Sequence, residues 1–123
     1  MTAPDGTGPD PADLEAALRA RTEAAAADLE AALGGVAACT RHKYGRVTGG
    51  MKYHEGRMVS YAEARRALAG GGLPVSRALH EHAQRWRDEF RRRAGGPEPW
   101  LAYATGGLEA AEDAAALAEQ GSP

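Results

Sequence analysis

The sequence predicts an all-α protein: a small helical bundle of about four helices, arranged as two helical hairpins. Alanine, the residue with the highest helix propensity, occupies 28 of the 123 positions. Isoleucine is absent, and other β-branched residues are too few for a β-sandwich or barrel. Apolar residues recur at steps of three and four between clusters of glycine and proline, as in amphipathic helices joined by short turns. This length suits one domain, which we place at residues 11–119.

The first helix is expected over residues 11–33, after a flexible N-terminal tail at residues 1–10. The tail is rich in proline and glycine, and Met1 is its only large apolar residue. Asp10 suits the N-cap, and Pro11 suits the first helical position. A stripe of apolar residues then follows at near-helical spacing: Leu14, Leu18, Ala25, Leu29 and Leu33.

Residues 36–69 allow two interpretations. Apolar residues keep a helical phase throughout, so one long helix is possible. Against it, Gly45, Gly49 and Gly50 would each cost a helix about 1 kcal/mol relative to alanine. We prefer a helical segment near 36–44, a glycine break, and a helix from about 50 to 69 with Thr48 as its N-cap.

A third helix is expected to open at Pro74 and to end in three arginines, the charge that a helix C-terminus favours. Its apolar face comprises Val75, Leu79, His82, Trp86 and Phe90.

A fourth helix should begin near Pro99. Its expected inner face comprises Trp100, Leu101, Ala104, Leu108, Ala111 and Leu117. The pair Gly106–Gly107 marks either a weak point or a close approach of helices. Residues 120–123 should fray.

The net charge of −2 is distributed unevenly along the chain. Residues 1–36 carry −5, residues 37–93 carry +8, and residues 94–123 carry −5. The single cysteine, Cys39, cannot form an intramolecular disulfide, which favours a cytoplasmic location. No apolar run is long enough to span a membrane, so no membrane association is expected.

Residues 41–57 interleave five basic residues with two tyrosines and four glycines. Glycines at a helix start could present free N–H groups to phosphate, and the tyrosines could stack on bases. The alternative is a turn whose basic residues neutralise the acidic first and fourth helices. The candidate nucleic-acid-binding or anion-binding residues, with two from the third helix, are Arg41, Lys43, Arg46, Gly49, Gly50, Lys52, Arg57, Arg91 and Arg92.

No motif predicts a metal, a cofactor or a catalytic residue. His80 and His82 would point about 200° apart on a helix, so they do not share a face. The preferred interpretation is therefore a non-enzymatic interaction module that binds a protein partner or itself. A nucleic-acid-associated accessory protein using residues 41–93 is the alternative. A small helical enzyme built around His54, Glu55 and Tyr61 is held in reserve.

Overall fold

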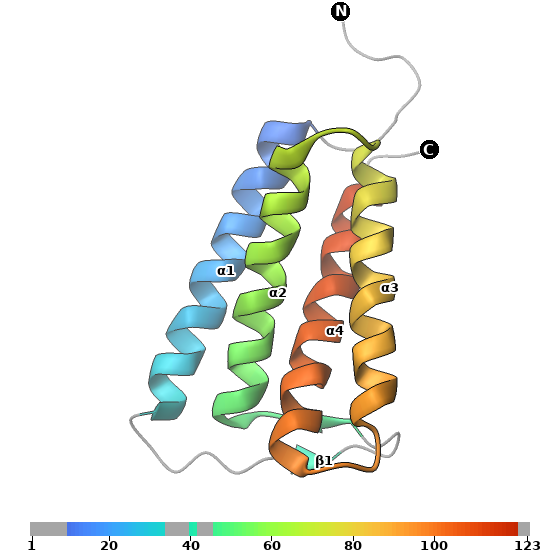
Figure 1. The fold of residues 1–123 in the computed structure, drawn as a ribbon. Coiled ribbons are helices and arrows are strands. Elements are labelled where there is room, and N and C mark those ends of the chain that lie inside the picture. Colours follow the sequence, from blue (N-terminus) through green and yellow to red (C-terminus); the bar gives the residue numbers. More distant parts are fainter. Residues whose placement is uncertain (1–9, 34–39, 42–45, 121–123) are drawn as a thin grey trace, which may run out of the picture.

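The computed structural model describes residues 10–33, 40–41 and 46–120. These residues form a bundle of four helices and one pair of very short strands, which confirms the predicted all-α class (Figure 1). No helix within the described ranges is both long and apolar enough to cross a membrane. In chain order the elements are α1 (Pro11–Leu33), β1 (Thr40–Arg41), β2 (Val47–Thr48), α2 (Gly50–Gly70), α3 (Val75–Arg93) and α4 (Glu98–Glu119).

The four helices alternate in direction, so α1–α2 and α3–α4 are the two expected antiparallel hairpins (Figure 1). The two hairpins are joined mainly by α2 and α4, which run parallel to each other and pack closely. α1 packs chiefly on α2, and α3 chiefly on α4. α4 is consequently covered on most of its surface, and alanines make up much of its buried face.

Two glycines make the close contact between α2 and α4 possible. A Cβ atom on Gly106 would lie 2.0 Å from the carbonyl oxygen of Tyr53, and one on Gly56 would lie 2.1 Å from that of Tyr103. A Cβ atom on Gly107 would meet the ring of Trp86 at 2.1 Å. Of the two interpretations of Gly106–Gly107, the close approach is therefore the correct one.

The start of α1 follows the sequence prediction. The Asp10 carboxylate accepts a hydrogen bond from the backbone N–H of Ala12 at 2.7 Å, as an N-cap does. Leu14, Leu18 and Ala25 are buried, whereas Leu33 is 63% exposed. The predicted apolar stripe thus enters the core only along the first two thirds of the helix.

The prediction for residues 36–44 is wrong at Thr40 and Arg41, which form a strand paired antiparallel with β2. The other residues of that segment lie outside the described part of the chain. Thr48 is not the N-cap of α2: it belongs to β2, and Gly49 precedes the helix without a side-chain cap. Gly49 and Gly50 both have positive φ angles, 85° and 83°, which allow the chain to turn from strand into helix.

The predicted inner faces of α3 and α4 are largely correct. Leu79, His82 and Trp86 are buried on α3, and Leu101 and Leu108 on α4. Trp100 is the exception, since it is 44% exposed. It lies in the first turn of α4, at the end of the bundle, where cationic side chains flank it in place of apolar ones.

Candidate functional site: an aromatic groove between α2 and α3

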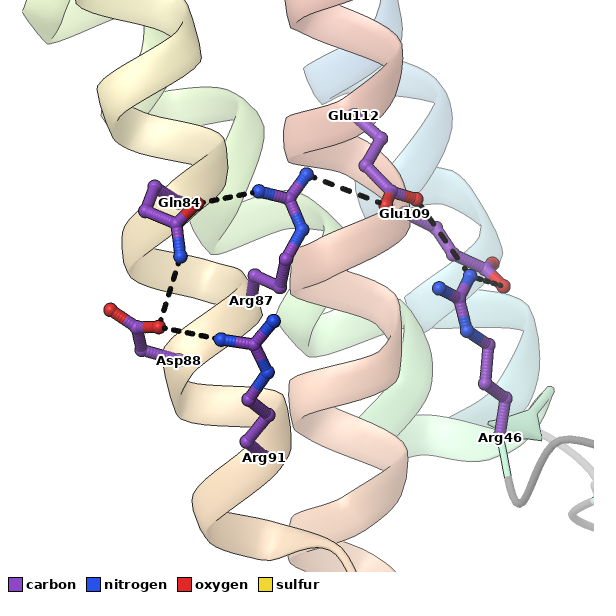
Figure 2. Close-up of polar contacts among 7 residues, drawn as sticks. All are labelled: Arg46, Gln84, Arg87, Asp88, Arg91, Glu109 and Glu112. Carbon is purple, nitrogen blue, oxygen red and sulfur yellow. Dashed lines mark hydrogen bonds and ion pairs between the residues drawn. The ribbon is translucent and has the colours of Figure 1, made fainter.

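Three carboxylates on α4 bind side chains from three helices and from the residue preceding β2. Arg46 Nη1 lies 3.6 Å from Glu109 Oε2 and 3.7 Å from Glu112 Oε1, and Arg87 Nη2 lies 3.9 Å from Glu112 Oε2 (Figure 2). We call this surface the ionic face; it comprises Arg21, Arg46, Tyr53, Tyr61, Arg87, Glu109, Glu112 and Asp113.

The remaining members of the ionic face tie α1 and α2 to α4. Asp113 accepts hydrogen bonds from Arg21 Nε at 2.5 Å and from the Tyr61 hydroxyl at 2.7 Å. The Tyr53 hydroxyl donates to Glu109 at 2.5 Å. Burial, together with the accepting carboxylate, raises the pKa of both tyrosines, so each remains a protonated donor at neutral pH.

Arg57 is held next to this surface by α1. It donates to Asp28 at 2.9 Å and to His54 Nδ1 at 2.8 Å, and its side chain is only 19% exposed. Burial, followed by the charge of Arg57, lowers the pKa of His54, so the imidazole is neutral at pH 7. A neutral ring leaves Nδ1 able to accept the guanidinium hydrogen bond.

Five of the candidate nucleic-acid-binding residues form ion pairs with acidic side chains. Arg46 and Arg57 pair with acidic residues of other helices, as described above. Lys52, Arg91 and Arg92 pair with acidic residues of their own helices: Glu55 at 3.1 Å, Asp88 at 3.3 Å and Glu89. Gly49 precedes α2 and Gly50 begins it; Lys43 lies outside the described residues, and only the backbone of Arg41 is described.

A groove opens on another side of α4, between α2 and α3. It holds about 350 Å³, with one wall from α2, the other from α3, and α4 as its floor. We call it the aromatic groove; it is lined by Glu63, Arg85, Trp86, Glu89, Arg92 and Tyr103. A larger hollow of about 460 Å³ is lined by α1 alone, so it has no opposing wall and is not a cleft.

A row of aromatic rings leads from Trp86 on the α3 wall, across Tyr103 on the floor, to Trp100 beyond the groove. The Tyr103 ring lies 5.6 Å from that of Trp86 and 6.1 Å from that of Trp100, measured between centroids. Trp100 extends the row to the end of the bundle, between Lys52 Nζ at 4.8 Å and Arg93 Cζ at 5.7 Å from its ring. Cations so placed are attracted by the electron-rich face of the indole.

The charged side chains of the groove differ in how they are paired. Glu63 accepts a hydrogen bond from Trp86 Nε1 at 2.9 Å. Glu89 accepts from Arg93 at 2.8 Å and from Arg92, and these hydrogen bonds lower its pKa. Arg85, in contrast, forms no ion pair with any residue that the structure describes. The groove therefore presents one cation without an internal carboxylate.

The residues of the reserve enzyme hypothesis do not converge. His54 accepts from Arg57, Glu55 pairs with Lys52, and Tyr61 donates to Asp113. Within residues 10–33, 40–41 and 46–120, no cluster of three histidine, cysteine or acidic residues is placed to hold a metal. His82 is buried and His80 exposed, which matches their predicted placement on different sides of α3.

Sequence reasoning identified the groove only in part. Arg85 lies in the basic middle segment of the sequence, but Tyr103 carried no signal beyond its spacing of three from Trp100. That spacing places both rings on one side of α4. Comparisons with protein-family models, with curated proteins and with solved structures find no match.

Proposed function

We propose that this protein is a non-enzymatic interaction module that binds a protein partner through the aromatic groove. The observation that carries the proposal is the row of rings that ends in the exposed Trp100, in a groove whose Arg85 forms no ion pair with any described residue. Tryptophan, tyrosine and arginine contribute most of the binding energy at protein interfaces. The single cysteine favours the reducing cytoplasm as the place of action.

The arrangement of polar groups supports binding more than catalysis. Acid–base or nucleophilic chemistry needs a proton-transferring group and a partner directed at one reacting atom. In the groove, the Glu63 carboxylate is engaged by an indole N–H and the Glu89 carboxylate by two guanidinium groups. Carboxylates held in this way fix the shape and the charge pattern of a surface, and a protein partner recognises a surface by its shape and charge.

Site-specific photo-crosslinking in the cells that make the protein tests the proposal. A photoreactive residue placed at Arg85 should capture one discrete partner, and one placed at Arg77 should not. Arg77 is the matched control because it is also an arginine of α3, is 68% exposed and lies outside the groove. Equal capture from both positions, or capture from neither, would contradict the proposal.

Binding to a second copy is the self-associating form of the same proposal. Light scattering coupled to size exclusion should then show a mass that rises with protein concentration, and Trp100→Ala should shift the mass toward the monomer. A constant monomeric mass would restrict the proposal to a different protein as partner.

Nucleic-acid binding is the second candidate, and one specific observation favours it. The side chains of Arg91 and Arg92 are each 66% exposed at the end of α3, close in sequence to Arg93, which lies against Trp100. A gel-shift titration at two salt concentrations should show weak binding that falls steeply with salt, because neutralised phosphates release counterions. No retardation at the lower salt concentration would exclude this candidate.

A further inference from the structure

We infer that the aromatic groove takes an acidic peptide segment that carries both a carboxylate, for Arg85, and an aromatic or large apolar side chain, for Tyr103 and Trp100. The inference rests on the proposed function and names the chemistry of the partner.

Arg85 supplies the charge argument. The carboxylates of both groove walls already have donors: Trp86 for Glu63, and Arg92 with Arg93 for Glu89. The exposed Arg85 guanidinium is the groove cation that forms no ion pair among the described residues. A planar guanidinium matches a carboxylate in two parallel hydrogen bonds, so a partner's aspartate or glutamate is its natural complement.

Tyr103 supplies both an apolar surface and a second donor. Its ring is partly exposed on the floor, packed between the rings of Trp86 and Trp100. Its hydroxyl forms no hydrogen bond with another described residue. Burial, followed by the charges of Glu63, Glu55 and Glu89, raises the pKa of this phenol, so it stays protonated and remains a hydrogen-bond donor.

Two glutamates of the groove favour a peptide over a polyphosphate chain. Glu63 on α2 and Glu89 on α3 line the groove together with Tyr103, so a phosphate backbone lying along the floor would meet a carboxylate from each wall. Like charges brought together at a partly desolvated interface oppose binding. A peptide can place one carboxylate at Arg85 and an uncharged ring elsewhere.

Three labelled polymers test the inference with the full chain. Fluorescence anisotropy would compare a random copolymer of glutamate and tyrosine, poly-glutamate, and an oligo-deoxythymidine of similar charge. We expect the copolymer to bind about tenfold more tightly than either of the others. Similar affinities for the copolymer and for poly-glutamate would show that charge alone is recognised and would overturn the inference.

Two charge-reversed variants locate the binding site. Arg85→Glu should weaken copolymer binding by at least about tenfold, whereas Arg77→Glu, with the same change in net charge, should alter it by less than about twofold. Tyr103→Phe, which removes only the hydroxyl, should weaken binding by a few-fold. Circular dichroism of each variant verifies that it is folded. Equal losses in Arg85→Glu and Arg77→Glu would overturn the inference.

The failure of the inference and the failure of the proposed function have different signatures. If the copolymer does not bind while crosslinking at Arg85 still captures a protein, the proposed function stands and the inferred partner chemistry is wrong. If the oligo-deoxythymidine binds more tightly than the copolymer, and Arg85→Glu abolishes that binding, both are wrong and the groove binds nucleic acid.

Discussion

The ionic face and the aromatic groove lie on two sides of the same helix and use similar residue types, but they leave different groups available. On the ionic face, the carboxylates of α4 are paired with arginines and tyrosines of other elements. In the groove, Glu89 is paired within its own helix, and Arg85 has no such partner among the described residues. The first surface joins helices, and the second remains open to another molecule.

This comparison shows how little the charge of a sequence segment says about the charge of a surface. Residues 37–93 carry +8 in the sequence. In the structure, Arg46, Arg57 and Arg65 face acidic residues of α4 and α1. Part of the basic middle segment is therefore neutralised internally, and another part, at the end of α3, remains exposed.

The largest expected effect on stability comes from Gly106, which allows the close approach of α2 to α4, the helix that both surfaces share. Gly106→Val should lower the free energy of unfolding by about 3 kcal/mol or more, because the new side chain meets the backbone of Tyr53, which no rotamer change can move. Urea denaturation measures the loss. Gly70→Ala is the control: a Cβ atom there meets nothing within 4 Å, so stability should be unchanged or slightly higher.

Acidification should weaken the contact of α2 with α3 at His82. This ring is fully buried; Nε2 lies 3.0 Å from the carbonyl oxygen of Ser60, and Nδ1 has no hydrogen-bond partner among the described residues. Burial lowers the pKa of His82, although Glu63 opposes the shift. The folded state thus resists protonation that the unfolded state accepts below about pH 6.5. The free energy of unfolding should therefore decrease as the pH falls below about 6.5, by up to about 1.4 kcal/mol per pH unit.

The test is to measure the midpoint of urea denaturation as a function of pH, between pH 7.5 and pH 5. His82→Gln should flatten the pH dependence, whereas His80→Gln should leave it steep because His80 is exposed. His54 contributes with the same sign, since its pKa is also lowered. An unchanged slope in His82→Gln would assign the acid sensitivity to other groups.

A smaller loss is expected on the ionic face. Asp113→Ala removes the acceptor of Arg21 and Tyr61 and should cost about 1 kcal/mol, a modest value because both members of the ion pair are partly exposed. Asp88→Ala, which removes a surface acceptor of Arg91 and Gln84 within α3, should stay within about 0.5 kcal/mol of the wild type. Equal costs would mean that pairing between elements stabilises no more than pairing within a helix.

The smallest effect on stability should come from the groove. Arg85→Glu removes no ion pair between described residues and should change the free energy of unfolding by less than about 0.5 kcal/mol. Thermal and urea denaturation both measure it. A loss as large as that of Asp113→Ala would make Arg85 a structural residue and remove the contrast between the two surfaces.

The helices could be predicted from the sequence because their signals are local. Asp10 and Pro11 marked the start of α1, and the glycines after residue 69 marked the end of α2. The strand at Thr40–Arg41 could not be predicted, since two residues are too few to show a period.

The groove could be predicted only in fragments, because three helices contribute to it. Helical spacing places Trp100 on the apolar side of α4, but whether a neighbour covers that side at its first turn depends on tertiary packing. Likewise, the sequence does not say that Arg57 faces Asp28 while Arg85 faces none of the described acids. Pairing between distant positions is set by the helix arrangement, which local patterns do not encode.

The central position of α4 also has a consequence for biosynthesis. α4 is the last of the four helices in the sequence, yet it covers the inner surfaces of both α2 and α3. As the chain leaves the ribosome, α2 and α3 emerge before the helix that covers their inner apolar surfaces. Chains grow from the N-terminus at about 5–20 residues per second, so these surfaces stay exposed for seconds until α4 has emerged. During that interval we expect the apolar surfaces of α2 and α3 to be accessible to chaperones, since the bundle can be completed only after α4 has emerged.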